Sequence, residues 1–274
     1  MGLTPITFLV NSVIVTFTQG AIMSPVAYEK DGAVGIVTLA KPPHNLIDNV
    51  MLQALAAAYE QAVGEGCRAI LLRSSMRHFC AGADLNLLPV ERWSQSELAR
   101  LWALLEDVPV PTVAAVHGAA LGGGFELALM CDMIVAADTA TFGMAEASLG
   151  LLPLLGGVQR VAQRAGVARA KEMAMFGRRH DARALERWGV INLVAAEAEL
   201  AAASLSWARQ LAAGATVAFR SIKTVANLAA RGGIAAADAQ QEEANTMMWN
   251  SRDQKRGLDA FAATGPGSAV FEGN

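Results

Sequence analysis

The chain alternates short apolar runs with amphipathic stretches, and this alternation limits its fold more than any other feature of the sequence. Short apolar runs are typical of buried strands, whereas apolar positions at helical spacing predict helices. The expected strands span 34–39, 69–73, 113–116 and 133–137. The expected helices span 50–63, 94–105, 125–130, 158–164, 168–176 and 182–188. Strands that alternate with helices predict an α/β fold.

The two ends of the chain differ from this pattern. From about Leu200 the sequence becomes alanine-rich and helical, without a further convincing strand. We therefore expect a core over 23–199 and a helical segment over 200–274. Residues 1–22 are apolar, but they lack the basic start of a signal peptide and are interrupted by polar residues. We expect a flexible extension there, and a weak export or membrane signal is the alternative.

The composition restricts the classes of partner. A net charge of −3 gives no broad basic surface, so neither a nucleic acid nor an anionic membrane is favoured. Only 17% of the residues are charged, below the roughly 25% of ordinary soluble domains. This shortage predicts surface buried between subunits. The three cysteines have no CxxC spacing and the four histidines are scattered, which predicts no metal site and a reducing, cytoplasmic location.

A glycine run between an expected strand and an expected helix is the first candidate for chemistry. It reads His117-Gly-Ala-Ala-Leu-Gly-Gly-Gly-Phe-Glu126. Glycines let the backbone approach a ligand closely, and the positive end of the following helix favours an anion. A tight turn needed only for packing is the alternative. Glu126 lies inside an otherwise apolar helix, where a buried carboxylate is costly unless it is used.

Two further segments carry small residues or an acid. The loop Ala81-Gly-Ala83-Asp84-Leu85 follows an expected strand, and its small side chains would let the Ala83 amide reach a ligand that the Gly123 amide also contacts. Two such donors would form an oxyanion hole. Glu146 follows a third loop, Thr141-Phe-Gly-Met-Ala, and could face the same cavity. Taken alone, it would be an exposed surface acid.

Together these segments resemble the crotonase family, also called the enoyl-CoA hydratase/isomerase family. The resemblance runs from about Pro25 to Gly273. It includes GxAxGGGxEL over 118–127, AGAD over 81–84, FGxxE over 142–146 and GGxQR over 156–160. Each motif is weak alone, but their order and joint occurrence are specific.

The resemblance implies a spiral of strand-strand-helix repeats with a C-terminal helical segment. It implies a homotrimer or homohexamer that acts on an acyl-CoA, with no cofactor beyond the coenzyme A of the substrate. The implied oxyanion hole is made by Ala83 and Gly123, and the implied catalytic pair is Glu126 and Glu146. The loop with Ala81, Asp84 and Leu85 would line the coenzyme A arm. The pair of acids favours hydration of a 2-enoyl-CoA.

The sequence also departs from the usual family pattern. Leu154 and Leu155 replace small residues after Pro153 and should narrow or reshape the wall beside Glu146, while Asn86 stands where lysine is common. Ala262-Ala-Thr replaces a basic stretch near the C-terminus. Double-bond isomerisation, decarboxylation and C–C cleavage are alternative reactions on the same scaffold, and a non-catalytic acyl-CoA-binding or RNA-binding relative is a further alternative.

Overall fold

A computed structural model describes residues 6–10, 13–17, 24–87 and 93–274. Its centre is a sheet in the order β11-β8-β6-β5-β4-β3. The members are β3 (Val26–Asp31), β4 (Val34–Leu39), β5 (Ala69–Ser74), β6 (Thr112–Val116), β8 (Met133–Ala137) and β11 (Leu193–Ala195). Only β3 runs antiparallel to its neighbour. The predicted α/β class is confirmed.

The central strands are buried on both faces. All five residues of β6 are buried, as are five of the six residues of β4. Parallel strands covered on both faces are continuous apolar runs, which explains why the sequence pattern located them closely. Strands β4 and β8 have the predicted bounds, and β5 and β6 differ from theirs by one residue at one end.

A second, smaller sheet lies beside the first and was missed by the sequence pattern. Its order is β10-β9-β7, with β7 (Ala119–Leu121), β9 (Thr141–Gly143) and β10 (His180–Asp181). Strands β6 and β8 of the large sheet are thus each followed by a strand of the small sheet. This is the expected strand-strand-helix repeat. Three-residue strands carry too little periodicity to be recognised, since their pairing depends on the rest of the fold.

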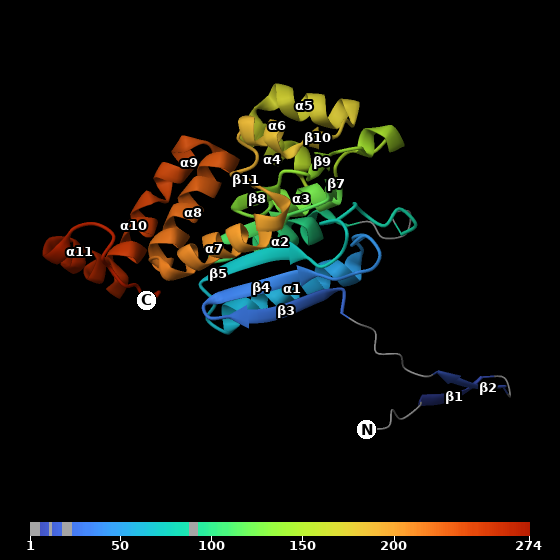
Figure 1. Ribbon diagram of the computed structural model, residues 1–274, viewed down its shortest axis with the longest axis horizontal. Coiled ribbons are helices and arrows are strands. Elements are labelled where there is room, and N and C mark those ends of the chain that lie inside the picture. The colour runs from blue at the N-terminus through green and yellow to red at the C-terminus, as the bar shows by residue number, and fades with distance from the viewer. Residues whose placement is uncertain (1–5, 11–12, 18–23, 88–92) are drawn as a thin grey trace.

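The helices of the core connect and cover the sheets (Figure 1). They are α1 (Asn49–Gly64), α2 (Gln95–Glu106), α3 (Gly123–Leu129), α4 (Gly157–Ala165), α5 (Val167–Phe176) and α6 (Ala182–Arg187). The predicted helix 125–130 is wrong at its start. Gly123 and Gly124 already form its first turn, because the preceding Gly122 adopts a φ of 51° and turns the chain into the helix.

The C-terminal part is helical, as predicted. It comprises α7 (Leu200–Ala213), α8 (Thr216–Gly232), α9 (Ile234–Ala239), α10 (Gln241–Trp249) and α11 (Arg252–Thr264). Helix α7 packs against β5, β6 and β8, whereas α8 to α11 lie together on one side of the molecule (Figure 1). The large apolar side chains of Ile222, Trp249 and Phe261 are exposed on these outer helices.

The predicted extension 1–22 lies mostly outside the described residues. Its described parts are β1 (Ile6–Val10) and β2 (Val13–Phe17), which pair as antiparallel strands. Among the residues that the structure describes, no helix is long and apolar enough to cross a membrane.

Candidate active site

Glu126 is a buried carboxyl group on α3. Its side chain is only 1% exposed, and its Oε1 atom accepts hydrogen bonds from the amides of Leu155 at 2.9 Å and Gly157 at 2.7 Å. Gly157 can approach so closely because it lacks a side chain: a Cβ atom built there would lie 2.9 Å from Glu126 Cγ. The two amides fix the direction in which the carboxyl group points.

Burial also changes the acidity of this group. Loss of solvation raises the pKa of Glu126 to about 7, and the nearby carboxyl group of Glu146 contributes in the same direction. The hydrogen bonds from Gly157 and Leu155 and the charge of Arg160 oppose the shift, because they stabilise the ionised form. A carboxyl group with a pKa near neutrality can exchange protons at physiological pH.

Glu146 lies at the start of a short 3-10 helix, η1 (Glu146–Leu149). It is half-buried, and burial raises its pKa above the usual value. Its Oε2 atom is buried, and no hydrogen-bond partner for this oxygen is found among the described residues. A Cβ atom built on Gly122 would lie 2.6 Å from Glu146 Oε1, so this carboxyl group rests directly on the glycine run.

The amides of Ala83 and Gly123 lie close together. A Cβ atom built on Gly123 would be 3.8 Å from the Ala83 nitrogen. The groups that flank the Ala83 amide are used elsewhere: the Gly82 carbonyl accepts from Ile47, and the Asp84 amide donates to the Ile47 carbonyl. Within the described part of the chain, the amides of Ala83 and Gly123 donate to no backbone carbonyl. Both donors are therefore free to bind a ligand.

Close backbone contact holds the two loops together. A Cβ atom built on Gly124 would lie only 2.2 Å from the Cys80 carbonyl oxygen. The Leu121 amide donates to that same oxygen at 3.0 Å, and the Cys80 amide donates to the Ala119 carbonyl at 3.1 Å. These contacts join the segment before Ala83 to the segment before Gly123, so the two free amides keep their relative position.

One cavity of about 220 Å³ collects most of the predicted site residues. Its walls include Ala81, Ala83, Leu85, Gly123, Glu126 and Glu146. Asp84 was predicted to belong with them but does not line this cavity. Its Oδ1 instead accepts hydrogen bonds from the backbone and side-chain nitrogens of Asn86, because the two residues form a local turn.

The remaining walls are mainly apolar. They include Trp93, Leu121, Leu149, Leu151, Leu154 and Leu155. Leu154 and Leu155 lie in the wall of this cavity, as expected from their replacement of smaller residues. No sequence motif singled out Trp93, which follows residues 88–92 that the structure does not describe. The role of Leu155 and Gly157 as donors to Glu126 was also missed, because a backbone amide donor does not depend on the type of residue that carries it.

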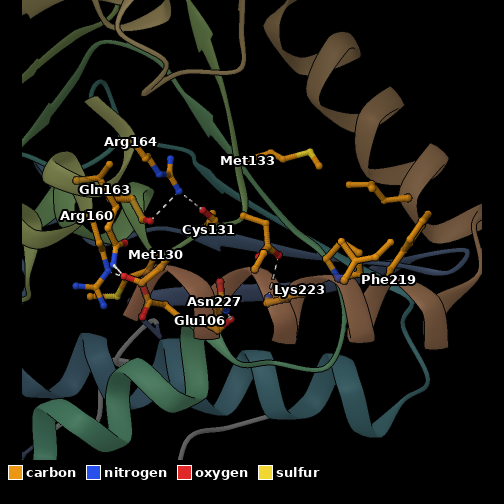
Figure 2. Close-up of a pocket in the computed structure, with 17 residues that line it drawn as sticks. Glu106, Met130, Cys131, Met133, Arg160, Gln163, Arg164, Phe219, Lys223 and Asn227 are labelled. Atoms are coloured by element: carbon orange, nitrogen blue, oxygen red, sulfur yellow. Dashed lines mark hydrogen bonds and ion pairs between the residues drawn. The ribbon is translucent and has the colours of Figure 1, made fainter. Parts of the chain in front are cut away.

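A larger cavity, of about 530 Å³, lies elsewhere, between the core and α8 (Figure 2). Its charged side chains are already engaged with protein groups. Lys223 pairs with Asp132 at 2.8 Å, Arg160 pairs with Glu106, and Arg164 donates to backbone carbonyls. The cavity contains neither the free amides nor the two glutamates, so we do not regard it as the active site.

Other candidate groups are occupied or isolated. Cys80 is buried, and burial raises the pKa of its thiol to about 12, which disfavours a reactive thiolate. His117 Nε2 lies 2.7 Å from the Met76 carbonyl oxygen. Within the described ranges no cluster of three or more histidine, cysteine, aspartate or glutamate side chains could hold a metal ion.

Comparisons with known proteins show the family of this chain. The sequence matches the family described as Enoyl-CoA hydratase/isomerase over residues 29–273. A probable enoyl-CoA hydratase of Mycobacterium bovis is 34% identical over 238 residues, which cover 85% of this chain and 93% of that protein. The 2,3-dehydroadipyl-CoA hydratase of Escherichia coli K12 is 30% identical over 249 residues, covering 87% and 96%.

Solved structures lead to the same family. An enoyl-CoA hydratase subunit from Geobacillus kaustophilus has a TM-score of 0.84 at 35% identity, covering 91% of this chain and 98% of that one. An enoyl-CoA hydratase from Bacillus anthracis has a TM-score of 0.80 at 26% identity, covering 91% and 100%. The chain therefore has the crotonase fold and belongs to the enoyl-CoA hydratase/isomerase family.

Proposed function

We propose that the protein is an enoyl-CoA hydratase, which adds water across the double bond of a 2-enoyl-CoA. The observation that carries this proposal is that one cavity is lined by Glu126, Glu146 and the residues of two free amides, Ala83 and Gly123. The names of the relatives support it, since several are called hydratases. Coenzyme A enters as part of the substrate, and no further cofactor is needed for this reaction.

The amides of Ala83 and Gly123 would bind the thioester oxygen. Attack of water at the β-carbon pushes negative charge onto this oxygen, and fixed donors stabilise that charge without rearranging. The loss of one such donor typically costs about 2.7–4 kcal/mol of transition-state stabilisation. Ala81 and Leu85, which line the same cavity, and the neighbouring Asp84 would contact the coenzyme A arm.

The two glutamates would divide the proton transfers. Ionised Glu126 would take a proton from the attacking water while the new C–O bond forms at the β-carbon. Protonated Glu146 would deliver its proton to the α-carbon, so that one water is added in total. The orientation of Glu126 by two amides suits a base that must point at a water. The unpaired Oε2 of Glu146 suits an acid whose proton must reach the substrate.

A product assay tests this proposal. The purified protein should hydrate crotonyl-CoA to 3-hydroxybutyryl-CoA, which is detected by loss of the enoyl-thioester absorbance and by mass spectrometry. A matched 3-enoyl-CoA should give little conjugated product. Rapid isomerisation of the 3-enoyl-CoA without hydration of crotonyl-CoA would favour the isomerase alternative. Binding of acyl-CoA without any turnover would favour the non-catalytic alternative.

We also propose that the C-terminal helical segment mediates assembly into trimers or hexamers. Its support is the exposed apolar surface on the outer helices, including Trp249, Leu258 and Phe261. Such side chains are unusual on a solvated surface when they occur together. Light scattering coupled to gel filtration would measure the mass, and a monomer would contradict this part of the proposal.

A further inference from the structure

The segment Leu155–Gly157 lies between Glu126 on one side and Arg160 on the other. Its amides, from Leu155 and Gly157, hold Glu126 Oε1. Its carbonyl oxygens are held in turn. Arg160 Nη1 donates to the Leu155 oxygen at 3.1 Å and to the Gly156 oxygen at 2.9 Å. The segment is thus fixed by a guanidinium group at the opposite edge from the carboxyl group that it orients.

Trp102 of α2 strengthens the same contact. Its indole Nε1 donates to the Leu155 carbonyl oxygen at 2.9 Å. The Arg160 guanidinium also lies over the Trp102 ring, 5.4 Å from its centroid. Two donors therefore converge on one carbonyl, and the peptide unit of that residue cannot rotate without losing both.

Arg160 is itself tightly held. It is only 8% exposed, and its Nε donates to Glu106 (Figure 2). Glu106 also pairs with Arg231 of α8 at 3.0 Å. A Cβ atom built on Gly156 would lie 2.0 Å from Arg160 Nη1, so the guanidinium presses directly on the backbone. Gly156 also has a φ of 92°, a conformation that favours glycine. Together these contacts restrict the guanidinium group of Arg160 to a single position.

We propose that Arg160, together with Trp102, is a positioning residue for Glu126: it fixes the 155–157 segment whose amides aim the carboxyl group into the cavity. The proposal rests on the proposed role of Glu126 as the base. Arg160 does not line the cavity that contains Glu126 and therefore acts through the backbone and through its charge.

Electrostatics provides a readout that a merely structural residue would not move. The charged groups that shift the pKa of Glu126 are Glu146, which raises it, and Arg160, which lowers it. Removing the positive charge should therefore raise the pKa of Glu126 further. Replacing arginine by lysine should preserve much of the charge while losing the paired contact with two carbonyl oxygens.

Arg164 offers a matched control on the same helix. It is partly buried and binds backbone carbonyls, those of Leu129 at 3.0 Å, Cys131 at 2.7 Å and Val190 at 3.1 Å. None of these belongs to the 155–157 segment. Figure 2 shows Arg160 and Arg164 at successive turns of α4. Arg164→Lys should thus lower stability without changing the aim or acidity of Glu126.

The experiment measures kcat, KM and the pH profile of crotonyl-CoA hydration in Arg160→Gln, Arg160→Lys, Trp102→Phe and Arg164→Lys. Arg160→Gln should lower kcat by about 10- to 100-fold, since a displacement of about 1 Å has effects of that order, with little change in KM. In the plot of kcat against pH, the ascending limb of this variant should lie at higher pH than that of the wild type. Arg160→Lys should also lower kcat, but its ascending limb should shift to higher pH by less than that of Arg160→Gln. Trp102→Phe should lower kcat least.

A second measurement does not depend on activity. The carboxyl carbon of Glu126, labelled with ¹³C and assigned by its absence in Glu126→Gln, can be titrated by NMR in the wild type and in each folded variant. A raised pKa in Arg160→Gln but not in Arg164→Lys supports the proposal. An unchanged Glu126 titration together with wild-type kcat in folded Arg160→Gln overturns it. If the wild type hydrates no 2-enoyl-CoA, the proposed function fails, while the titration still tests the coupling.

Discussion

The two glutamates of the cavity stand in contrasting surroundings. Glu126 belongs to a helix, is almost fully buried and accepts hydrogen bonds from two backbone amides. Glu146 begins a short 3-10 helix, is half-buried and leaves one buried oxygen without a partner among the described residues. Burial raises the pKa of both groups.

The contrast indicates how one reaction can use two identical side chains differently. A carboxyl group held by donors has a fixed direction, which suits the task of orienting a water molecule. A carboxyl group with a free oxygen keeps a site for a proton that must leave during the reaction. The environment, and not the residue type, would assign the roles.

Replacing either carboxyl group by an amide should abolish most turnover. Glu126→Gln and Glu146→Gln preserve volume, so each should lower kcat by about 10²- to 10⁴-fold, the usual contribution of a general acid or base. Circular dichroism should show an intact fold, and binding of the product thioester should persist. Near-wild-type hydration by either variant would remove that residue from its proposed role.

The stability of the protein should depend on pH through Glu126. Its pKa in the folded state, about 7, exceeds the usual carboxyl value of 4.5, so ionisation disfavours the folded state. The stability linked to the protonated form is therefore complete below pH 4.5 and is lost as the pH rises through 7. The loss should be at most roughly 3.5 kcal/mol, given about 1.4 kcal/mol per pKa unit.

Thermal unfolding of the wild type and of Glu126→Gln between pH 5 and pH 8 measures this effect. The melting temperature of the variant, relative to the wild type, should increase with pH. Glu146→Gln is the matched control and should show a smaller trend, because its carboxyl group is only half-buried. Parallel pH curves for wild type and Glu126→Gln would contradict the shifted pKa.

Two glycine substitutions should disturb the glutamates separately. Gly122→Ala would place a Cβ atom 2.6 Å from Glu146 Oε1 at a φ of 51°, and Gly157→Ala would place one 2.9 Å from Glu126 Cγ. Each should lower kcat by about 10- to 100-fold through displacement. Gly64→Ala, where the added atom meets nothing within 4 Å, is the control. If Gly157→Ala leaves the ascending limb of the plot of kcat against pH unchanged, Glu126 is not the group whose titration produces that limb.

The smallest expected effect concerns the acyl chain. Leucines 149, 151 and 154 follow Glu146 in the chain, and the charged side chains among the described lining residues are only the two glutamates. An ω-carboxylate would find no cation there and would be repelled. We expect kcat/KM for 2-hexenoyl-CoA to exceed that for 2,3-dehydroadipyl-CoA, of equal chain length, by at least about tenfold. Equal values would show that a cation reaches the substrate.

Much of the fold was predictable because buried segments consist mainly of apolar residues, which the sequence displays directly. Strand β8 is apolar throughout and β4 is apolar except at Thr38, and both were located with the correct bounds. The glycine run and Glu126 were found for a similar reason, since three glycines and a glutamate inside an apolar helix are conspicuous, whereas Glu146 was identified only through the family resemblance. The catalytic roles themselves and the cytoplasmic location stay predictions.

Other features could not have been read from the sequence. The amides that hold Glu126 come from Leu155 and Gly157, and every residue except proline has an amide. The contact of Arg160 with that segment depends on helix α4 folding back over it. The small sheet of β7, β9 and β10 depends on pairings between segments far apart in the chain.

The three consecutive glycines 122–124 have a consequence for how this site can vary. A Cβ atom added at each of them would meet a different neighbour: Glu146 at Gly122, Ile47 at Gly123 and the Cys80 backbone at Gly124. A single methyl group at any of them would meet a separate obstacle, so no one compensating change elsewhere could relieve all three. Homologous sequences adapted to other substrates should therefore differ in the leucine-lined wall and keep this tripeptide unchanged.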